Sequence, residues 1–250
     1  MSEHIIYHKD GAVAAIRFNR PEKKNAITVA MYQAMVDALN DAARDDAVHA
    51  VGIFGGNDFT AGNDLGDFLA AGVIGATPDD LPVVKLLRAL IAFPKPLLAG
   101  VKGVAIGIGT TMLMHCDAVV AGRSARFALP FTRLGLVPEA ASSVLLPLIA
   151  GRMRASWLML SGDQFGADEA KEIGIINRVT DDEHVDKAVS LMCGALAELP
   201  PNAVANTKRL LKAQFTEQIN RAMDEELTAF IAALKSDEAR AAFMKFMSRG

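Results

Sequence analysis

The sequence predicts an α/β protein in which buried parallel strands are joined by helices and followed by a helical C-terminal region. In the first part of the chain, short apolar segments alternate with segments of helical periodicity, the pattern typical of parallel strands with crossover helices. From Asp182 onward nearly the whole sequence has helical periodicity. The chain has 250 residues, of which 51% are hydrophobic, and this is enough to bury a large core.

The first predicted elements end at residues that form turns. Alternating apolar residues indicate a strand over 11–19, which stops before Pro21. Thr28 is a suitable N-cap for an amphipathic helix that extends to about Arg44. An apolar strand over 48–54 then ends in a Gly-Gly-Asn-Asp turn.

The later elements are predicted from the same signals, namely apolar periodicity interrupted by proline and glycine. They are a helix over 81–93, a strand over 97–101, small residues leading into a helix over 103–114, a strand over 117–121, a loop over 130–138, and helices over 139–150, 202–215, 217–234 and 237–248.

Composition excludes several classes of protein. There are 26 Lys and Arg residues against 29 Asp and Glu residues, so the net charge is −3, and the near-neutral balance argues against a nucleic-acid partner. Cys116 and Cys193 are too few to organise a fold of this size with disulfides. The most apolar segment, 103–114, is too short to span a bilayer, and no targeting signal is visible. We therefore expect a cytoplasmic protein without a membrane span.

Familiar catalytic motifs are absent from the sequence. There is no His-Glu-x-x-His, Cys-x-x-Cys, Gly-x-Ser-x-Gly or phosphate-binding glycine loop, so neither a metal nor a cofactor is expected. The segment 107–112 faintly resembles a dinucleotide fingerprint, but Met112 replaces the third glycine. Two segments rich in small residues remain, 59–65 and 103–109. Their main-chain N–H groups could form an oxyanion hole, although two ordinary tight turns would give the same pattern.

Taken together, the segments resemble the enoyl-CoA hydratase/isomerase (crotonase) superfamily over most of the chain. Each match is loose, but all occur in the family's order. They are NRPEKKNAI at 19–27, FTAGNDL at 59–65, KP at 95–96, VKGVAIGIG at 101–109, CD at 116–117 and GADEA at 166–170.

The resemblance implies a crotonase-like ββα spiral core over residues 1–195. It also implies a helical region over 196–250 that packs homotrimers, often paired into hexamers. The substrate would be an acyl-CoA thioester, with CoA as part of the substrate rather than a cofactor. The thioester oxygen would bind the N–H groups of Ala61 and Ile108. The implied substrate and CoA contacts are Lys24, Ala26, Thr60, Gly62, Asn63, Asp64, Leu65, Gly107, Phe131 and Leu136.

Lysines beside the first motif have two interpretations. Lys23 or Lys24 would lie near the CoA phosphates if the resemblance extends to them, while the loop from Ala61 to Leu65 would surround the adenine. Both lysines could equally be solvated surface residues.

The acid–base residues separate the possible reactions. The family's hydratases use two glutamates, and the corresponding positions here are Thr111 and Phe131, which cannot exchange protons near neutral pH. The segment PFTRLGLVPEAASS at 130–143 instead resembles the peroxisomal-type Δ3,Δ2-enoyl-CoA isomerases, in which the glutamate after proline is the base. That residue is Glu139, although an acidic residue in the first turn of a helix is common for structural reasons alone.

The sequence therefore favours an enoyl-CoA Δ-isomerase that moves a 3-enoyl double bond to the trans-2 position through Glu139. A single carboxyl group suffices, because the proton taken from C2 returns at C4. Another crotonase-type reaction, such as hydration or hydrolysis, is the second hypothesis. An inactive acyl-CoA-binding protein is the third.

Overall fold

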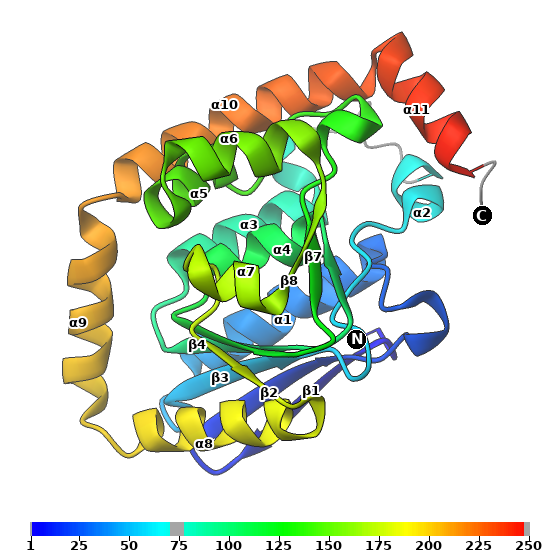
Figure 1. Cartoon of the computed structure of the whole chain (residues 1–250). Helices are drawn as coiled ribbons and strands as arrows, with labels where there is room; N and C mark the ends of the chain where they lie inside the picture. The colour runs from blue at the N-terminus through cyan, green and yellow to red at the C-terminus, as the bar shows by residue number, and fades with distance from the viewer. Residues whose placement is uncertain (1, 71–77, 248–250) are drawn as a thin grey trace.

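A six-stranded sheet forms the centre of the molecule. Figure 1 shows the computed structural model, which describes residues 2–70 and 78–247. The first two strands form an antiparallel hairpin, and every other pair of neighbours is parallel. In spatial order the strands are β1 (Ile5–Asp10), β2 (Val13–Phe18), β3 (Ala50–Phe54), β4 (Leu97–Val101), β6 (Ala118–Gly122) and β9 (Arg178–Thr180).

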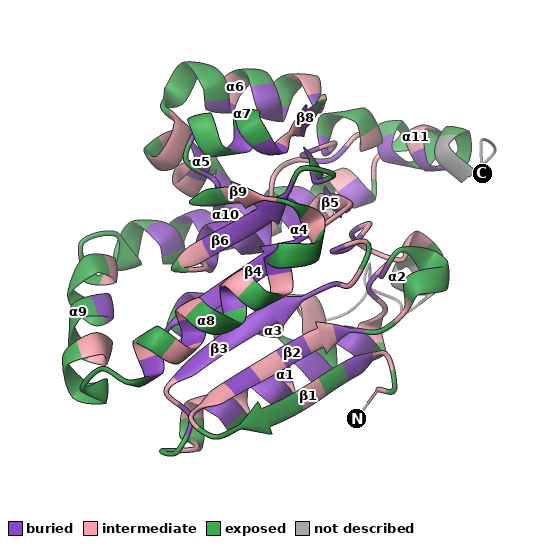
Figure 2. Ribbon diagram, turned by 60° about the horizontal axis from the view of Figure 1, so that its bottom comes forward, coloured by how far each residue is buried: buried purple, intermediate pink, exposed green. Residues whose placement is uncertain are grey.

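Helices pack on both faces of this sheet (Figure 2). Helices α1 (Val29–Arg44) and α3 (Pro82–Ala92) pack together on one face, and α8 (Val185–Ala197) packs against β3, β4 and β6 on the other. All residues of β3 and β4 are consequently buried. This explains why these strands are continuous apolar runs in the sequence, without a polar face.

A second, three-stranded sheet brings separate loops together. It consists of β5 (Val104–Ile106), β7 (Arg126–Ala128) and β8 (Gln164–Gly166), with β7 in the middle. After β5 the chain turns at Gly107 into the short helix α4 (Ile108–Thr111). A bridge between Thr60 and Ala105 connects the loop after β3 to the same sheet.

The last quarter of the chain is helical, as predicted, and it encloses the core. Helix α10 (Thr216–Leu234) packs on α5 (Ser142–Ala150), as Figure 1 shows. Helix α11 (Asp237–Met247) contacts the 3₁₀ turn η4 (Thr132–Leu134). The remaining elements are η1 (Pro21–Lys23), α2 (Leu65–Ala70), η2 (Pro78–Asp80), η3 (Met112–His115), α6 (Arg152–Ser161), α7 (Ala167–Glu172), η5 (Asp182–His184) and α9 (Pro201–Ala213).

The structure confirms the α/β prediction and corrects some of its details. The strand predicted over 11–19 is the second strand of a hairpin, whose first strand the prediction missed. The helix predicted from Glu139 begins at Ser142. The short strands of the second sheet were not predicted, and Ser248, the predicted end of the last helix, lies outside the described residues.

Candidate active site

Glu139 lies in a turn before α5 whose main chain has an uncommon conformation. Ala140 and Ala141 have φ angles of +64° and +54°, in the left-handed region, which costs a non-glycine residue roughly 1–2 kcal/mol. The Glu139 carbonyl accepts hydrogen bonds from the N–H and the hydroxyl of Ser142, and the Ala140 carbonyl lies 2.9 Å from Nε2 of His115. These contacts fix the turn. Glu139 is therefore outside the helix, and the prediction of a helix over 139–150 is wrong at its start.

The Glu139 carboxyl group is buried and only partly paired. Its Oε1 accepts a 2.5 Å hydrogen bond from the Thr111 hydroxyl, whereas Oε2 has no partner among residues 2–70 and 78–247. Burial raises the pKa of Glu139 to about 8; the Thr111 hydrogen bond opposes this shift and the charge of Glu226 adds to it. A carboxyl group with a pKa near neutrality can both accept and return a proton.

A cavity of about 920 Å³ brings most of the predicted site residues together. It lies between the loops that follow β3, β5 and β7, and the helices α10 and α11 contribute Phe230, Leu234 and Phe243 to its wall. The predicted residues that line it are Ala26, Ala61, Gly62, Asn63, Asp64, Leu65, Gly107, Ile108, Phe131, Leu136 and Glu139.

Two predicted contact residues do not line this cavity. Lys23 lines it in place of Lys24. Thr60 is fully buried: its hydroxyl donates to the Asn25 carbonyl at 2.6 Å and accepts from the Gly62 N–H at 3.0 Å. Thr60 thus shapes the loop from inside, and the prediction that it contacts substrate directly has no support in this geometry.

Asn25 holds the same loop through its side chain. Its buried side-chain NH₂ donates to the carbonyls of Gly55, Asp58 and Phe59, at 2.6, 2.7 and 3.2 Å. Its Oδ1 accepts from the Arg20 N–H at 2.8 Å. The NRPEKKNAI segment therefore has a physical role, because it fixes the loop that borders the cavity.

The two predicted oxyanion-hole amides differ in their bonding. The Ile108 N–H begins α4 and has no hydrogen-bond partner in the part of the chain that the structure describes. The Ala61 N–H instead donates to the Lys24 carbonyl at 2.9 Å. One amide is thus available to a ligand as the structure stands, and the other is already engaged.

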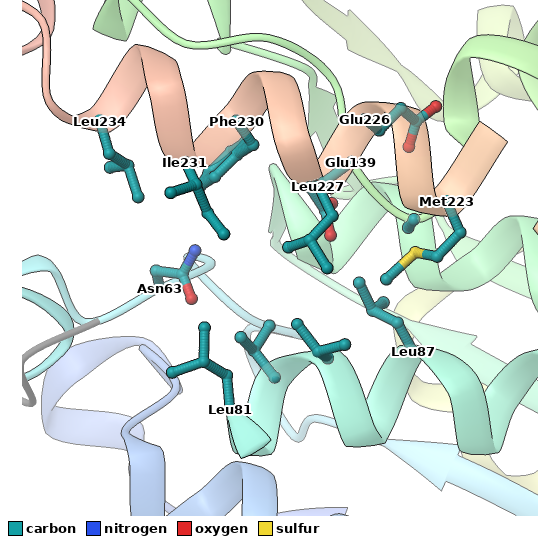
Figure 3. Close-up of a pocket in the computed structure, with 13 residues that line it drawn as sticks. Asn63, Leu81, Leu87, Glu139, Met223, Glu226, Leu227, Phe230, Ile231 and Leu234 are labelled. Carbon is teal, nitrogen blue, oxygen red and sulfur yellow. The ribbon is translucent and has the colours of Figure 1, made fainter. Parts of the chain in front are cut away.

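A narrow apolar extension of about 40 Å³ continues the cavity past Glu139. Figure 3 shows α3 and α10 facing each other across it, with the Glu139 carboxylate directed into the space between them. Asn63 lies at one end, and its Oδ1 accepts a 2.5 Å hydrogen bond from the buried Tyr32 hydroxyl. The remaining lining residues are Leu81, Val83, Val84, Leu87, Ala140, Met223, Glu226, Leu227, Phe230, Ile231 and Leu234.

Sequence reasoning missed two residues at this site. Thr111 appeared to be only the replacement of a hydratase glutamate, yet its hydroxyl binds the predicted base. Glu226 had no sequence signal, because acidic residues are common on amphipathic helices and its position against Ser143 depends on a contact between residues 83 apart.

The described residues contain no group of three or more His, Cys, Asp or Glu side chains placed to bind a metal ion. Within the same residues, no single helix is long and apolar enough to cross a membrane. One pair, Asp182–Ala197 and Pro201–Ala213, meets those criteria jointly but is bent by 108°.

The fold and the site together define a class: an α/β protein in which a buried carboxyl group and a free amide at a helix start share one cavity. This arrangement suits proton transfer next to a carbonyl group. The chain belongs to the enoyl-CoA hydratase/isomerase family of the crotonase superfamily, whose family profile matches residues 8–250.

Similar proteins support this membership. Enoyl-CoA delta isomerase 2 of Rattus norvegicus is 37% identical over 99% of this chain; the chain spans 64% of the length of that protein. The 1,2-epoxyphenylacetyl-CoA isomerase of Escherichia coli (strain K12) is 33% identical, with 100% of this chain and 97% of that protein covered. A crystal structure of an enoyl-CoA hydratase/isomerase from Pseudoalteromonas atlantica T6c has a TM-score of 0.93 and 38% identity, covering 99% of this chain and 98% of the other.

Proposed function

We propose that this protein is an enoyl-CoA Δ-isomerase that converts a 3-enoyl-CoA thioester into its trans-2 isomer. The observation that carries the proposal is the buried carboxyl group of Glu139, whose pKa lies near neutrality and whose Oε2 has no partner among the described residues, in a cavity shared with the Ile108 N–H. No carboxyl group stands at the two positions where the family's hydratases have one, since these are Thr111 and Phe131.

The proposed reaction uses Glu139 twice. Ionised Oε2 takes a proton from C2, and the electrons of the C–H bond form a C1–C2 double bond while the thioester oxygen gains negative charge. The same carboxyl group then donates the proton to C4, and a double bond between C2 and C3 results. Atoms and charges balance without water, so one carboxyl group is sufficient.

Main-chain amides would stabilise the negative oxygen. The Ile108 N–H has no hydrogen-bond partner in residues 2–70 and 78–247 and lies at the positive end of α4, so we propose it as the first donor. Ala61 is the second proposed donor, and its N–H must be shared with, or released from, the Lys24 carbonyl when the thioester binds. The apolar extension between α3 and α10 would take the acyl chain.

The proposed CoA contacts lie around the remainder of the cavity. Residues 61–65 would surround the adenine, and Lys23 is better placed than Lys24 to approach the phosphates, because it lines the cavity. CoA would thus bind as part of the substrate.

The test is the isomerisation of 3-hexenoyl-CoA by the purified protein and by Glu139→Gln. Conjugation of the new double bond with the thioester raises the ultraviolet absorbance, and chromatography identifies the product. We expect trans-2-hexenoyl-CoA from the wild type and almost none from the variant. Full turnover by the variant would show that Glu139 is not the catalytic base. Net formation of 3-hydroxyacyl-CoA would indicate a hydratase instead, and tight CoA binding without turnover an acyl-CoA-binding protein.

A homo-oligomer also belongs to this proposal. Helix α6 has large apolar side chains on its surface, namely Met153, Trp157 and Leu160, which are 75%, 65% and 72% exposed. Such exposure supports the proposal that another copy of the chain covers this surface. We propose a homotrimer, or two trimers paired into a hexamer. Light scattering after size exclusion measures the mass directly, and a monomer would contradict the proposal.

A further inference from the structure

Glu226 on α10 is a second buried carboxyl group beside the candidate base, and the mechanism above does not use it. It is 7% exposed, and its Oε1 accepts a 2.8 Å hydrogen bond from the Ser143 N–H in the first turn of α5. Its Oε2 has no partner among the described residues. Although Glu226 contributes to the lining of the apolar extension, Figure 3 shows its carboxylate directed away from the centre of that space. Direct contact with the acyl chain is therefore not its role.

We propose that Glu226 is a positioning residue for Glu139: it fixes the turn that presents the base and places a negative charge beside it. This inference rests on the isomerase function proposed above. It assigns a role in the reaction to a residue of the C-terminal helical region, 87 positions after the base in the sequence.

The first part of the argument is mechanical. The turn between Glu139 and α5 passes through Ala140 and Ala141, both in the left-handed region, so it needs outside contacts to persist. Glu226 supplies one of these contacts, because its carboxylate binds at the first turn of α5, where unpaired amides and the helix dipole favour a negative group. The direction of the Glu139 side chain is thereby coupled to the position of α10.

The second part is electrostatic. The polar groups around Glu139 include the Thr111 hydroxyl from α4, the Tyr32 hydroxyl from α1, the uncharged Asn63 amide and Glu226 from α10. Burial lowers the pKa of His115 in η3 to about 4, so this ring adds no positive charge at neutral pH. Glu226 is thus the charged neighbour among these groups, and two adjacent carboxyl groups titrate as a coupled pair.

Glu226→Gln separates the two parts. Glutamine keeps an oxygen acceptor for the Ser143 N–H but removes the charge, so the turn remains and the apparent pKa of the base falls. For the pH profile of kcat/KM on 3-hexenoyl-CoA, we expect the acid limb to move down by about one pH unit. Activity well below the midpoint then rises up to about tenfold, while the plateau falls because the base is weaker.

Two further variants complete the experiment. Glu226→Leu removes the acceptor as well, so we expect a lower kcat with a smaller change in KM, because the base is misplaced. Glu225→Gln is the matched control: it removes one charge from the neighbouring, exposed position of α10, and its profile should equal that of the wild type. Circular dichroism and thermal unfolding establish that each variant is folded.

The outcomes are distinct. An acid limb that moves down in Glu226→Gln but stays in place in Glu225→Gln supports the proposal. An unchanged profile in Glu226→Gln overturns it, as does an equal loss of activity in Glu226→Gln and Glu226→Leu without any shift. If the wild type does not isomerise 3-enoyl-CoA, the proposed isomerase function is wrong, and the role of Glu226 is tested in another way. The charge effect is then measured without substrate, by infrared titration of the Glu139 carboxyl band, which Glu139→Gln identifies. If the titration midpoint of Glu139 is the same in the wild type and in Glu226→Gln, the proposed effect of the Glu226 charge is refuted.

Discussion

Replacing Glu139 by glutamine should abolish turnover and at the same time stabilise the protein, with a gain that grows with pH. The substitution keeps the size of the side chain and an oxygen that can accept the Thr111 hydrogen bond. It removes the one property that burial penalises, which is the negative charge. A general base contributes roughly 10²–10⁴-fold to a rate, so activity should fall at least by that factor.

The magnitude of the stability gain follows from the pKa of Glu139, which is 4.5 ordinarily and about 8 in the fold. Between these pH values the folded state retains a proton that the unfolded chain has lost. The stability of the wild type therefore falls as pH rises through this range. Each pH unit between these values lowers the free energy of unfolding by about 1.36 kcal/mol. The loss of stability is therefore about 3 kcal/mol at pH 7, and it levels off at about 5 kcal/mol above pH 8. Relaxation of the site reduces both values, so they are upper limits.

Urea unfolding at pH 4.5 and pH 8 measures this difference. We expect Glu139→Gln and the wild type to be nearly equal at pH 4.5, where the carboxyl group is neutral in the fold and only half ionised in the unfolded chain, and the variant to be more stable at pH 8. Glu225→Gln is the control, because Glu225 is exposed and its replacement should give no gain that depends on pH. If Glu139→Gln shows the same difference from wild type at both pH values, the reasoning from burial is refuted.

Three further predictions concern the groups around the base. Thr111→Val removes the hydrogen bond that lowers the pKa of Glu139, so the acid limb of the kcat/KM profile should move to higher pH and activity at pH 7 should fall about tenfold; an unmoved limb would contradict this. Ile108→Pro removes the free N–H at a helix position that accepts proline, so kcat should fall about 10²–10³-fold in the isomerase assay, and wild-type kcat would exclude this amide as a donor. Asn25→Ala leaves three carbonyls without their donor, so the free energy of unfolding should fall by about 3 kcal/mol; an unchanged urea midpoint would show that the loop does not depend on Asn25.

Local sequence signals were sufficient for the long elements of the fold. Thr28 does cap α1, because its side chain accepts a hydrogen bond from the Met31 N–H. The buried strands β3 and β4 are apolar throughout, and the sequence shows this directly. By contrast, β1 has only Ile5 buried, so it lacks an apolar pattern. The strands of the second sheet have three residues each, which is too short for any periodicity to be recognised.

The candidate site was only partly predictable for a related reason. Glu139 was found through the segment around it, since its spacing resembles a known family pattern. The contacts that determine its chemistry come from other parts of the chain: Thr111 lies 28 residues earlier, and Ser143 and Glu226 are 83 residues apart. The sequence also gave no indication that the Ala61 N–H is bonded to Lys24, because that bond depends on how two loops meet.

The contacts of α10 explain why a buried carboxyl group such as that of Glu139 needs the C-terminal helices. Burial of Glu139 is unfavourable for its charge, and the turn beside it has two left-handed alanines, so the isolated core would gain by relaxing both. Helix α10 opposes relaxation in two ways: Phe230 and Leu234 close the apolar wall of the cavity, and Glu226 binds the start of α5. The division of the chain at residue 195 stays a prediction about its organisation, but the site extends across it. The helical last quarter thus contributes to the environment of Glu139 as well as to the surface of the molecule.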